Sequence, residues 1–188
     1  YQAKEMSPIN TLCQLFPEKA SLFMIELFLK TQDQESAEGR WILTTLTSLG
    51  PFLGKALFRR YADAPEEEIP RLITLAEISM DKHLASSLEQ LLGHKKFEIR
   101  SLAVAALGRL KAEKSVSHLS EILSQKSWLA GKKTKSLQTQ AARALFAIGT
   151  PEAKRALEQI AGGGSGELHK LCTELSTSLG GQNGRAAS

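Results

Sequence analysis

The chain has 188 residues, of which 42% are hydrophobic and 23% are charged, and its formal net charge is +4. This composition excludes a chain that is disordered along its length. It also excludes a transmembrane helix, because no uncharged apolar run reaches the roughly 18 residues that a span needs. The charge is unevenly divided, since residues 1–94 carry −4 and residues 95–188 carry +8. A basic half of this size indicates either a solvated lysine-rich surface or an acidic partner.

The first residue indicates how the chain begins, and the two cysteines indicate the redox compartment of the protein. Tyr1 stands where an initiator Met would, and no signal-peptide pattern follows, so we expect a fragment or a processed chain. Cys13 and Cys172 lie near opposite ends without a CxxC motif. We therefore expect two small buried residues of a reducing, cytoplasmic compartment rather than a disulfide or a zinc site.

Helical periodicity runs along the whole chain, and no segment alternates as a strand does. Ser7-Pro8 predicts a helix start, and that helix ends before Pro17. The segment 18–30 is apolar nearly all round and predicts a deeply buried helix. Further helices are expected at 38–49, 51–62, 70–80, 82–93, 97–111, 114–126, 135–148, 152–161 and 166–179. The Gly- and Ser-containing segment 181–188 predicts a disordered tail.

An internal repeat connects these helices. The sequence IRSLAVAALGRL at 99–110 aligns with LQTQAARALFAIG at 137–149. The same frame places apolar anchors at Leu49, Met80, Leu110, Ile148 and Leu179, spaced by 31, 30, 38 and 31 residues. We attribute the longer spacing to an insertion of about seven residues around Trp128 to Lys135.

This pattern resembles the HEAT and HEAT-like (PBS-lyase-type) repeat family, whose motif V-R-x-x-A-A-x-A-L-G-x-I is matched by residues 99–110. The resemblance is strongest over 82–161 and extends weakly across 38–180. It departs from the motif where Gln138, His169 and Pro70 replace its arginine. The resemblance implies an all-α solenoid of about five antiparallel helix pairs. We expect a helical cap at 1–37, the repeat array at 38–180 and the tail at 181–188.

The repeat frame has small residues at some positions and leucines at others, and helix packing explains both. Ala103, Ala106, Ala141 and Ala144 allow neighbouring helices to approach closely. Leu107 and Leu145 occupy equivalent positions between helical layers and are expected to be core anchors.

Motifs of catalysis are missing from the sequence. It contains no P-loop, GxSxG, HExxH or Gly-rich dinucleotide turn. The run Gly162–Gly166 predicts a flexible loop, and the carboxylates of Asp63 and Glu66–Glu68 suit the positive end of a helix. We expect no enzyme activity, no cofactor and no metal site.

A binding surface is the remaining expectation. In HEAT-like arrays the second helix of each pair lines a curved, usually concave face, and the variable motif positions point outward there. The predicted partner-binding residues are Arg40, Trp41, Arg71, Leu75, Arg109, Arg143 and Lys170. With Leu72 and Leu102 nearby, they would form a basic groove with apolar contacts that suits an acidic peptide. Alternatively, some of these leucines pack against the adjoining helix.

The insertion is a second basic segment, in which one tryptophan stands among lysines. Its residues are Lys126, Trp128, Lys132, Lys133 and Lys135. Such a segment is typical of a nucleic-acid backbone contact, or its tryptophan folds back onto its own repeat.

The sequence therefore predicts a non-catalytic protein-binding scaffold, forming one domain of a larger, bacterial-type protein. One alternative is a module that binds nucleic acid through the basic half. Another is an accessory domain of a tetrapyrrole-modifying enzyme, because bilin lyases use similar repeats. The oligomeric state is left open.

Overall fold

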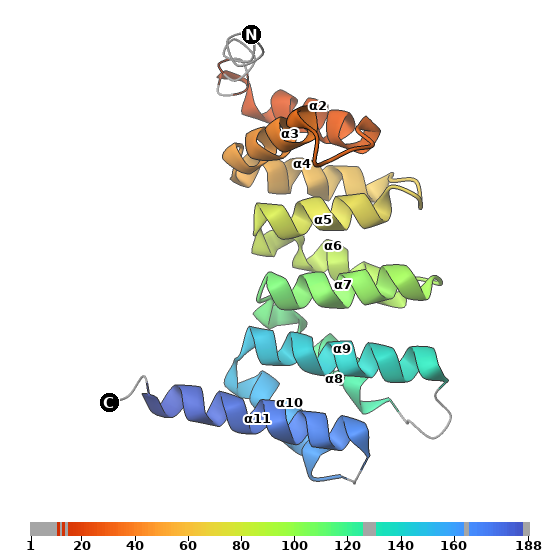
Figure 1. Cartoon of the computed structure of the whole chain (residues 1–188), viewed down its shortest axis with the longest axis vertical. Coiled ribbons are helices and arrows are strands. Elements are labelled where there is room, and N and C mark those ends of the chain that lie inside the picture. The colour runs from red at the N-terminus through yellow and green to blue at the C-terminus, as the bar shows by residue number, and fades with distance from the viewer. Residues whose placement is uncertain (1–10, 12, 14, 126–130, 164–165, 186–188) are drawn as a thin grey trace. The chain divides into compact units, whose positions relative to one another are not determined.

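The computed structural model describes residues 11, 13, 15–125, 131–163 and 166–185. Every regular element in these ranges is a helix, which confirms the predicted all-α class (Figure 1). The chain divides into two compact units, Tyr1–Leu84 and Ala85–Ser188. None of the helices described is long and apolar enough to cross a bilayer.

The first unit consists of two helix pairs. Its elements are α2 (Pro17–Lys30), α3 (Ala37–Ser48), α4 (Pro51–Ala62), α5 (Ile69–Ser79) and the short 3-10 helix η1 (Lys82–Leu84). Helix α2 packs against both α3 and α4, and α4 packs against α5. The segment expected to be a separate cap at 1–37 therefore contributes α2 to the same core as the first predicted repeat.

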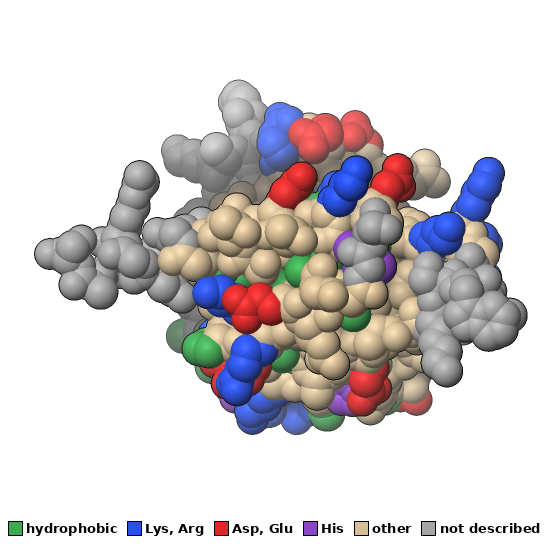
Figure 2. Space-filling model, turned by 90° about the horizontal axis from the view of Figure 1, so that it is seen from below, with side chains coloured by type: hydrophobic (Ala, Val, Ile, Leu, Met, Phe, Trp, Pro, Cys, Tyr) green, Lys and Arg blue, Asp and Glu red, His purple; other side chains and the backbone are tan. Residues whose placement is uncertain are grey.

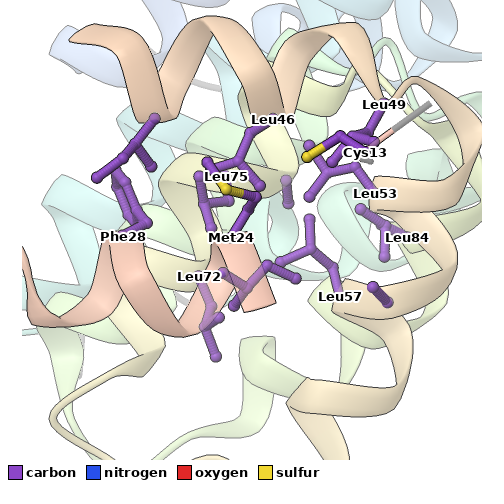
Figure 3. Packing of buried hydrophobic residues seen from close by; sticks show 14 residues of the cluster. Cys13, Met24, Phe28, Leu46, Leu49, Leu53, Leu57, Leu72, Leu75 and Leu84 are labelled. Carbon is purple, nitrogen blue, oxygen red and sulfur yellow. The ribbon is translucent and has the colours of Figure 1, made fainter. Parts of the chain in front are cut away.

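Side chains from all four helices form the core of the first unit. Met24 of α2, Leu46 of α3, and Leu72 and Leu75 of α5 point toward one another in this core (Figure 3). Each is fully buried, with a relative exposure of 0%. Burying one such side chain contributes about 1.5–3 kcal/mol, so this cluster holds the helices of the unit together.

Helix α2 is buried on one side only. Ser21, Met24, Ile25 and Phe28 face the core, whereas Phe23 is 62% exposed and Leu22 is 39% exposed. The prediction of a deeply buried helix is therefore confirmed for one face of α2 and wrong for the face that carries Leu22 and Phe23. Its apolar composition is real, but α3 and α4 cover a single face of it.

The second unit contains the segment with the strongest repeat pattern. Its elements are α6 (Ala85–Gln90), η2 (Leu91–Gly93), α7 (Phe97–Arg109), η3 (Glu113–Ser115), α8 (Val116–Ser124), α9 (Lys132–Ile148), α10 (Pro151–Ala161) and α11 (Glu167–Arg185). They form the pairs α6/α7, α8/α9 and α10/α11, and the second helices α7, α9 and α11 pack side by side in that order (Figure 1). That the pairs of both units form one superhelix stays a prediction.

The helix ends follow local chemistry. Thr150 accepts a hydrogen bond from the backbone N–H of Ala153 at 3.2 Å, and Pro151 occupies the first helical position of α10. Just before them, Gly149 ends α9 with φ of +72°, a left-handed conformation that glycine adopts without strain. The sequence Gly149-Thr150-Pro151 thus turns the chain from α9 into α10.

Small residues bring α7 and α9 together, as expected. Ala103 and Ala106 of α7 and Ala141 of α9 are fully buried, with 0% exposure, and Ala144 is 4% exposed. Leu107 and Leu145 are also fully buried, which confirms them as core positions. The two helices therefore approach closely along their length.

Two expectations about helix ends need correction. Met80, an expected anchor, is 61% exposed, because it has a left-handed backbone conformation (φ 51°) after the end of α5 that turns it away from the core. Helix α11 continues to Arg185, so residues 181–185 are helical rather than a tail. Extending an existing helix requires ordering only one residue for each new hydrogen bond, which allows even this polar segment to continue it.

Candidate functional site

Arg71 has a structural role in the first unit. Its guanidinium donates hydrogen bonds to the carbonyl oxygens of Phe28 (2.5 Å), Leu29 (2.6 Å) and Thr31 (2.6 Å). It also lies 4.8 Å from the centroid of the Phe28 ring. A cation is favoured at this negative end of α2, where the last carbonyl groups have no partner within the helix. Arg71 is half-buried and engaged by its own chain, so its predicted place on an open binding face is wrong.

Other polar side chains near the beginning of second helices behave in the same way. Arg40 of α3 donates to the carbonyl of Glu35, and Arg100 of α7 donates to the carbonyl of His94 at 2.8 Å. Gln138 of α9 donates to the carbonyls of Leu123 (3.1 Å) and Gln125 (2.7 Å). Arg100 and Gln138 occupy the arginine position of the repeat motif, so an amide performs this task where arginine is absent. Arg40 and Arg71 lie one position later in the same frame and also fasten a preceding loop or helix end.

The predicted apolar contacts of the first unit belong to its core. Leu72 and Leu75 are both fully buried, with 0% exposure, so they cannot contact a partner. Of the two readings of these leucines, exposure to a partner is therefore wrong and packing against neighbouring helices is confirmed, because α5 places both of them in the core. Trp41 is half-buried against the same core, and its indole Nε1 is buried without a hydrogen-bond partner. Only Arg40, of the predicted residues in this unit, is exposed.

The second unit retains the predicted exposed residues. Arg109 of α7, Arg143 of α9 and Lys170 of α11 are all exposed, and Leu102 of α7 is 38% exposed. The side chains of Ser101 and Gln140 share a hydrogen bond of 2.7 Å between α7 and α9. Leu102 follows Ser101, and Arg143 lies about one turn beyond Gln140.

These contacts define a surface on neighbouring helices. We name Ser101, Leu102, Gln140 and Arg143 the α7–α9 surface. It combines a partly exposed leucine, an exposed guanidinium and polar groups that are held in place by a hydrogen bond. The neighbouring helix α11 adds a shallow hollow of about 520 Å³, lined by Lys170, Thr173, Glu174, Thr177 and Ser178.

The basic insertion is shorter than expected. Helix α9 begins at Lys132, so Lys132, Lys133 and Lys135 lie in its first turns rather than in a loop, and all three are exposed. Gly131 ends the loop as the N-cap of the helix. Lys133 lies 3.9 Å from a carboxylate oxygen of Glu98 and 5.6 Å from the centroid of the Phe97 ring, so α7 stabilises this early start. Lys126 and Trp128 lie outside the described residues.

The surface of the second unit around α10 and α11 carries mixed charge. Figure 2 shows Lys and Arg interspersed with Asp and Glu, and only small hydrophobic areas between them. Arg155 of α10 forms an ion pair with Glu152 at 2.6 Å, and Lys154 pairs with Glu158 at 3.6 Å. The positive charge of this half is thus partly neutralised by neighbouring carboxylates.

Cys13, Cys172 and Tyr61 lie in the helical packing, and burial raises the pKa of each. Burial raises the pKa of the Cys172 thiol to about 11, and it also raises the pKa of Cys13. Both thiols are free. Burial, with the nearby carboxylate of Glu77, raises the pKa of Tyr61. Within the described part of the chain, no group of three or more His, Cys, Asp or Glu side chains is arranged to hold a metal ion.

Comparison with known proteins adds no assignment: no protein-family model matches the chain, and no curated protein matches it significantly.

Proposed function

We propose that the chain is a HEAT-like, non-catalytic scaffold that binds an acidic, partly apolar segment of a protein partner on the α7–α9 surface. The observation that carries this proposal is the 38% exposure of Leu102 beside the Ser101–Gln140 hydrogen bond and the exposed Arg143. An apolar contact next to a guanidinium suits a peptide that alternates apolar and acidic side chains. Lys170 adds an exposed positive charge on α11, the helix next to α9.

Nucleic-acid binding is the second candidate, and a different group of residues favours it. Lys132, Lys133 and Lys135 are exposed together at the start of α9, where phosphate groups would contact them. A phosphate backbone needs cations but has no use for an exposed leucine. Leu102 therefore distinguishes the two candidates.

Fluorescence anisotropy with two labelled probes tests the proposal. One probe is a peptide of alternating Glu and Leu, and the other is a DNA duplex of the same net charge. Replacing Arg143 and Lys170 by Glu is expected to weaken peptide binding at least 10-fold, because attraction becomes repulsion. Leu102→Ser is expected to weaken peptide binding about 5-fold and to leave DNA binding unchanged.

The matched control reverses two cations elsewhere in the same unit. Lys114→Glu with Arg155→Glu changes the net charge equally, and these residues lie on η3 and α10. This control should leave peptide binding within about twofold of the unmodified chain. The proposal is wrong if both charge-reversal pairs weaken peptide binding equally, or if Leu102→Ser leaves peptide binding unchanged. Tighter binding of DNA that is lost on reversing Lys132, Lys133 and Lys135 would establish the second candidate instead.

A further inference from the structure

A stripe of exposed residues, apolar in the middle and charged at both ends, runs along the outer side of α2. Lys19, Leu22, Phe23 and Glu26 are all exposed, and at 100° per residue they fall within a stripe about 100° wide. Met24, Ile25 and Phe28, on the opposite side, are buried in the core. Just before the helix, Phe16 is 59% exposed and Leu15 is 66% exposed. We name Lys19, Leu22, Phe23 and Glu26 the outer face of α2.

This outer face continues onto the neighbouring helix. Leu22 and Phe52 of α4, the latter 40% exposed, line one small groove between the two helices. An ion pair between Glu18 and Lys55, at 2.5 Å, lies along the same groove. The apolar area is therefore contiguous across α2 and α4 rather than a set of single exposed side chains.

The outer side of α11 shows a different composition. Its exposed positions include Thr173, Glu174, Thr177 and Ser178, which are polar. Helices that end a stack of repeats carry polar outer faces, because solubility requires it. A contiguous apolar patch on a helix instead marks an interaction site.

The charges of the outer face identify what fits it. Lys19 precedes Leu22 by three residues, and Glu26 follows Phe23 by three residues. Two α2 helices packed antiparallel, with Leu22 of one opposite Phe23 of the other, therefore place Lys19 of each opposite Glu26 of its partner. The outer face is therefore self-complementary, as the surface patch in a twofold-symmetric interface must be.

We propose that a second copy of this chain binds the outer face of α2, forming a twofold-symmetric dimer in which the two α2 helices pack antiparallel. Leu22 and Phe23 supply the apolar contact, and two Lys19–Glu26 pairs fix the direction of the helices. Glu26 already lies 3.1 Å from Arg60 of its own chain, and half of its side-chain surface (50%) is still exposed to meet the partner's lysine. This proposal is independent of the binding function of the α7–α9 surface.

The expected association is moderate. A single helix face with its flanking residues buries less than the roughly 800 Å² per partner of a standard interface. We therefore expect a dissociation constant in the micromolar range. Phe23→Ser removes the more exposed of the two apolar side chains of the outer face and should weaken dimerisation at least 10-fold.

Sedimentation equilibrium of the full chain, over a range of concentrations, measures this association. Lys19→Glu places two carboxylates opposite each other in every pair, and Glu26→Lys places two ammonium groups opposite each other. Each variant alone should therefore dimerise about 5-fold more weakly. Mixing the two variants restores opposite charges at both pairs, so the mixture should form a heterodimer at least as tightly as the unmodified chain forms its homodimer. Lys114→Glu, in the second unit, is the matched single charge reversal and should change nothing.

Several results would overturn the proposal. A chain that stays monomeric at several hundred micromolar rejects the dimer outright. A mixture of Lys19→Glu and Glu26→Lys that associates no better than either variant alone rejects the antiparallel pairing. Because Glu26→Lys also places a lysine beside Arg60, circular dichroism must show that this variant is folded. If it is not, Lys19→Glu mixed with the unmodified chain decides the question, since one repulsive pair should weaken association less than two.

Discussion

Gly108 of α7 lies directly against Ala144 of α9, so that a Cβ atom at position 108 would lie 2.8 Å from the Cα atom of Ala144 and 2.9 Å from its Cβ atom. Both distances are far shorter than a van der Waals contact, and the first involves backbone, which cannot move aside cheaply. The glycine is thus required by the close approach of two helices. It stands where the repeat motif also has glycine.

Gly108→Ala should destabilise the second unit. Overpacking costs about 1–3 kcal/mol, which exceeds the gain of about 1 kcal/mol from better helix propensity. Guanidinium denaturation followed by circular dichroism measures the change. The control is Gly180→Ala in α11, where the nearest atom would be the mobile Nζ of Lys154 at 3.3 Å. Gly180→Ala should be neutral or stabilising, and equal effects of the two substitutions would contradict the packing argument.

Leu107→Ala and Leu145→Ala should each destabilise the second unit by about 2–5 kcal/mol, because both side chains are fully buried. Leu102→Ala is the matched comparison, since it removes the same atoms from a side chain that is 38% exposed. It should cost much less in the same denaturation experiment. A cost for Leu102→Ala similar to that for Leu107→Ala would mean that α7 is oriented differently.

Arg71→Met should destabilise the first unit by about 1–3 kcal/mol, because three carbonyl groups at the end of α2 lose their donor. The fluorescence of Trp41, which packs on the core of this unit, together with circular dichroism, follows the unfolding. Arg71→Lys should recover only part of the loss, since an ammonium group cannot reproduce the planar fork. Arg59→Met, at an exposed position on α4, is the control and should have little effect.

Cys172 should make stability depend on pH in the alkaline range. Its pKa rises from 9.0 to about 11 on folding. Between these values the folded chain holds a proton that the unfolded chain has lost, so stability is fully present below pH 9 and falls as the pH rises toward 11. Denaturation midpoints across this window should decline more steeply for the unmodified chain than for Cys172→Ala. Equal slopes would show that the thiol does not titrate differently on folding. Native Cys172 should also react slowly with a thiol reagent until the chain unfolds.

The periodicity of apolar residues was sufficient to predict the positions of the helices and many of the buried residues. Apolar spacing placed most helix ends within a few residues, and Leu107 and Leu145 were identified as buried from their equivalent positions. The glycine of Gly149-Thr150-Pro151 and the cap that follows it were readable because such signals act between residues close in sequence. Local chemistry decides these features, so the sequence by itself determined them.

Tertiary structure decided which side chains are available to a partner. The pattern could not show that Arg71 reaches back to the end of α2, about 40 residues earlier in the chain, because that contact depends on how helices pack. It could not show that Leu75 is buried while Leu102 is partly exposed, since both occupy variable positions of the same motif. Nor could it show that α2, apolar nearly all round, is covered on one side only. A sequence pattern records that a side chain is apolar or charged, but its exposure depends on the neighbouring helices, and these are brought together only by the folded chain.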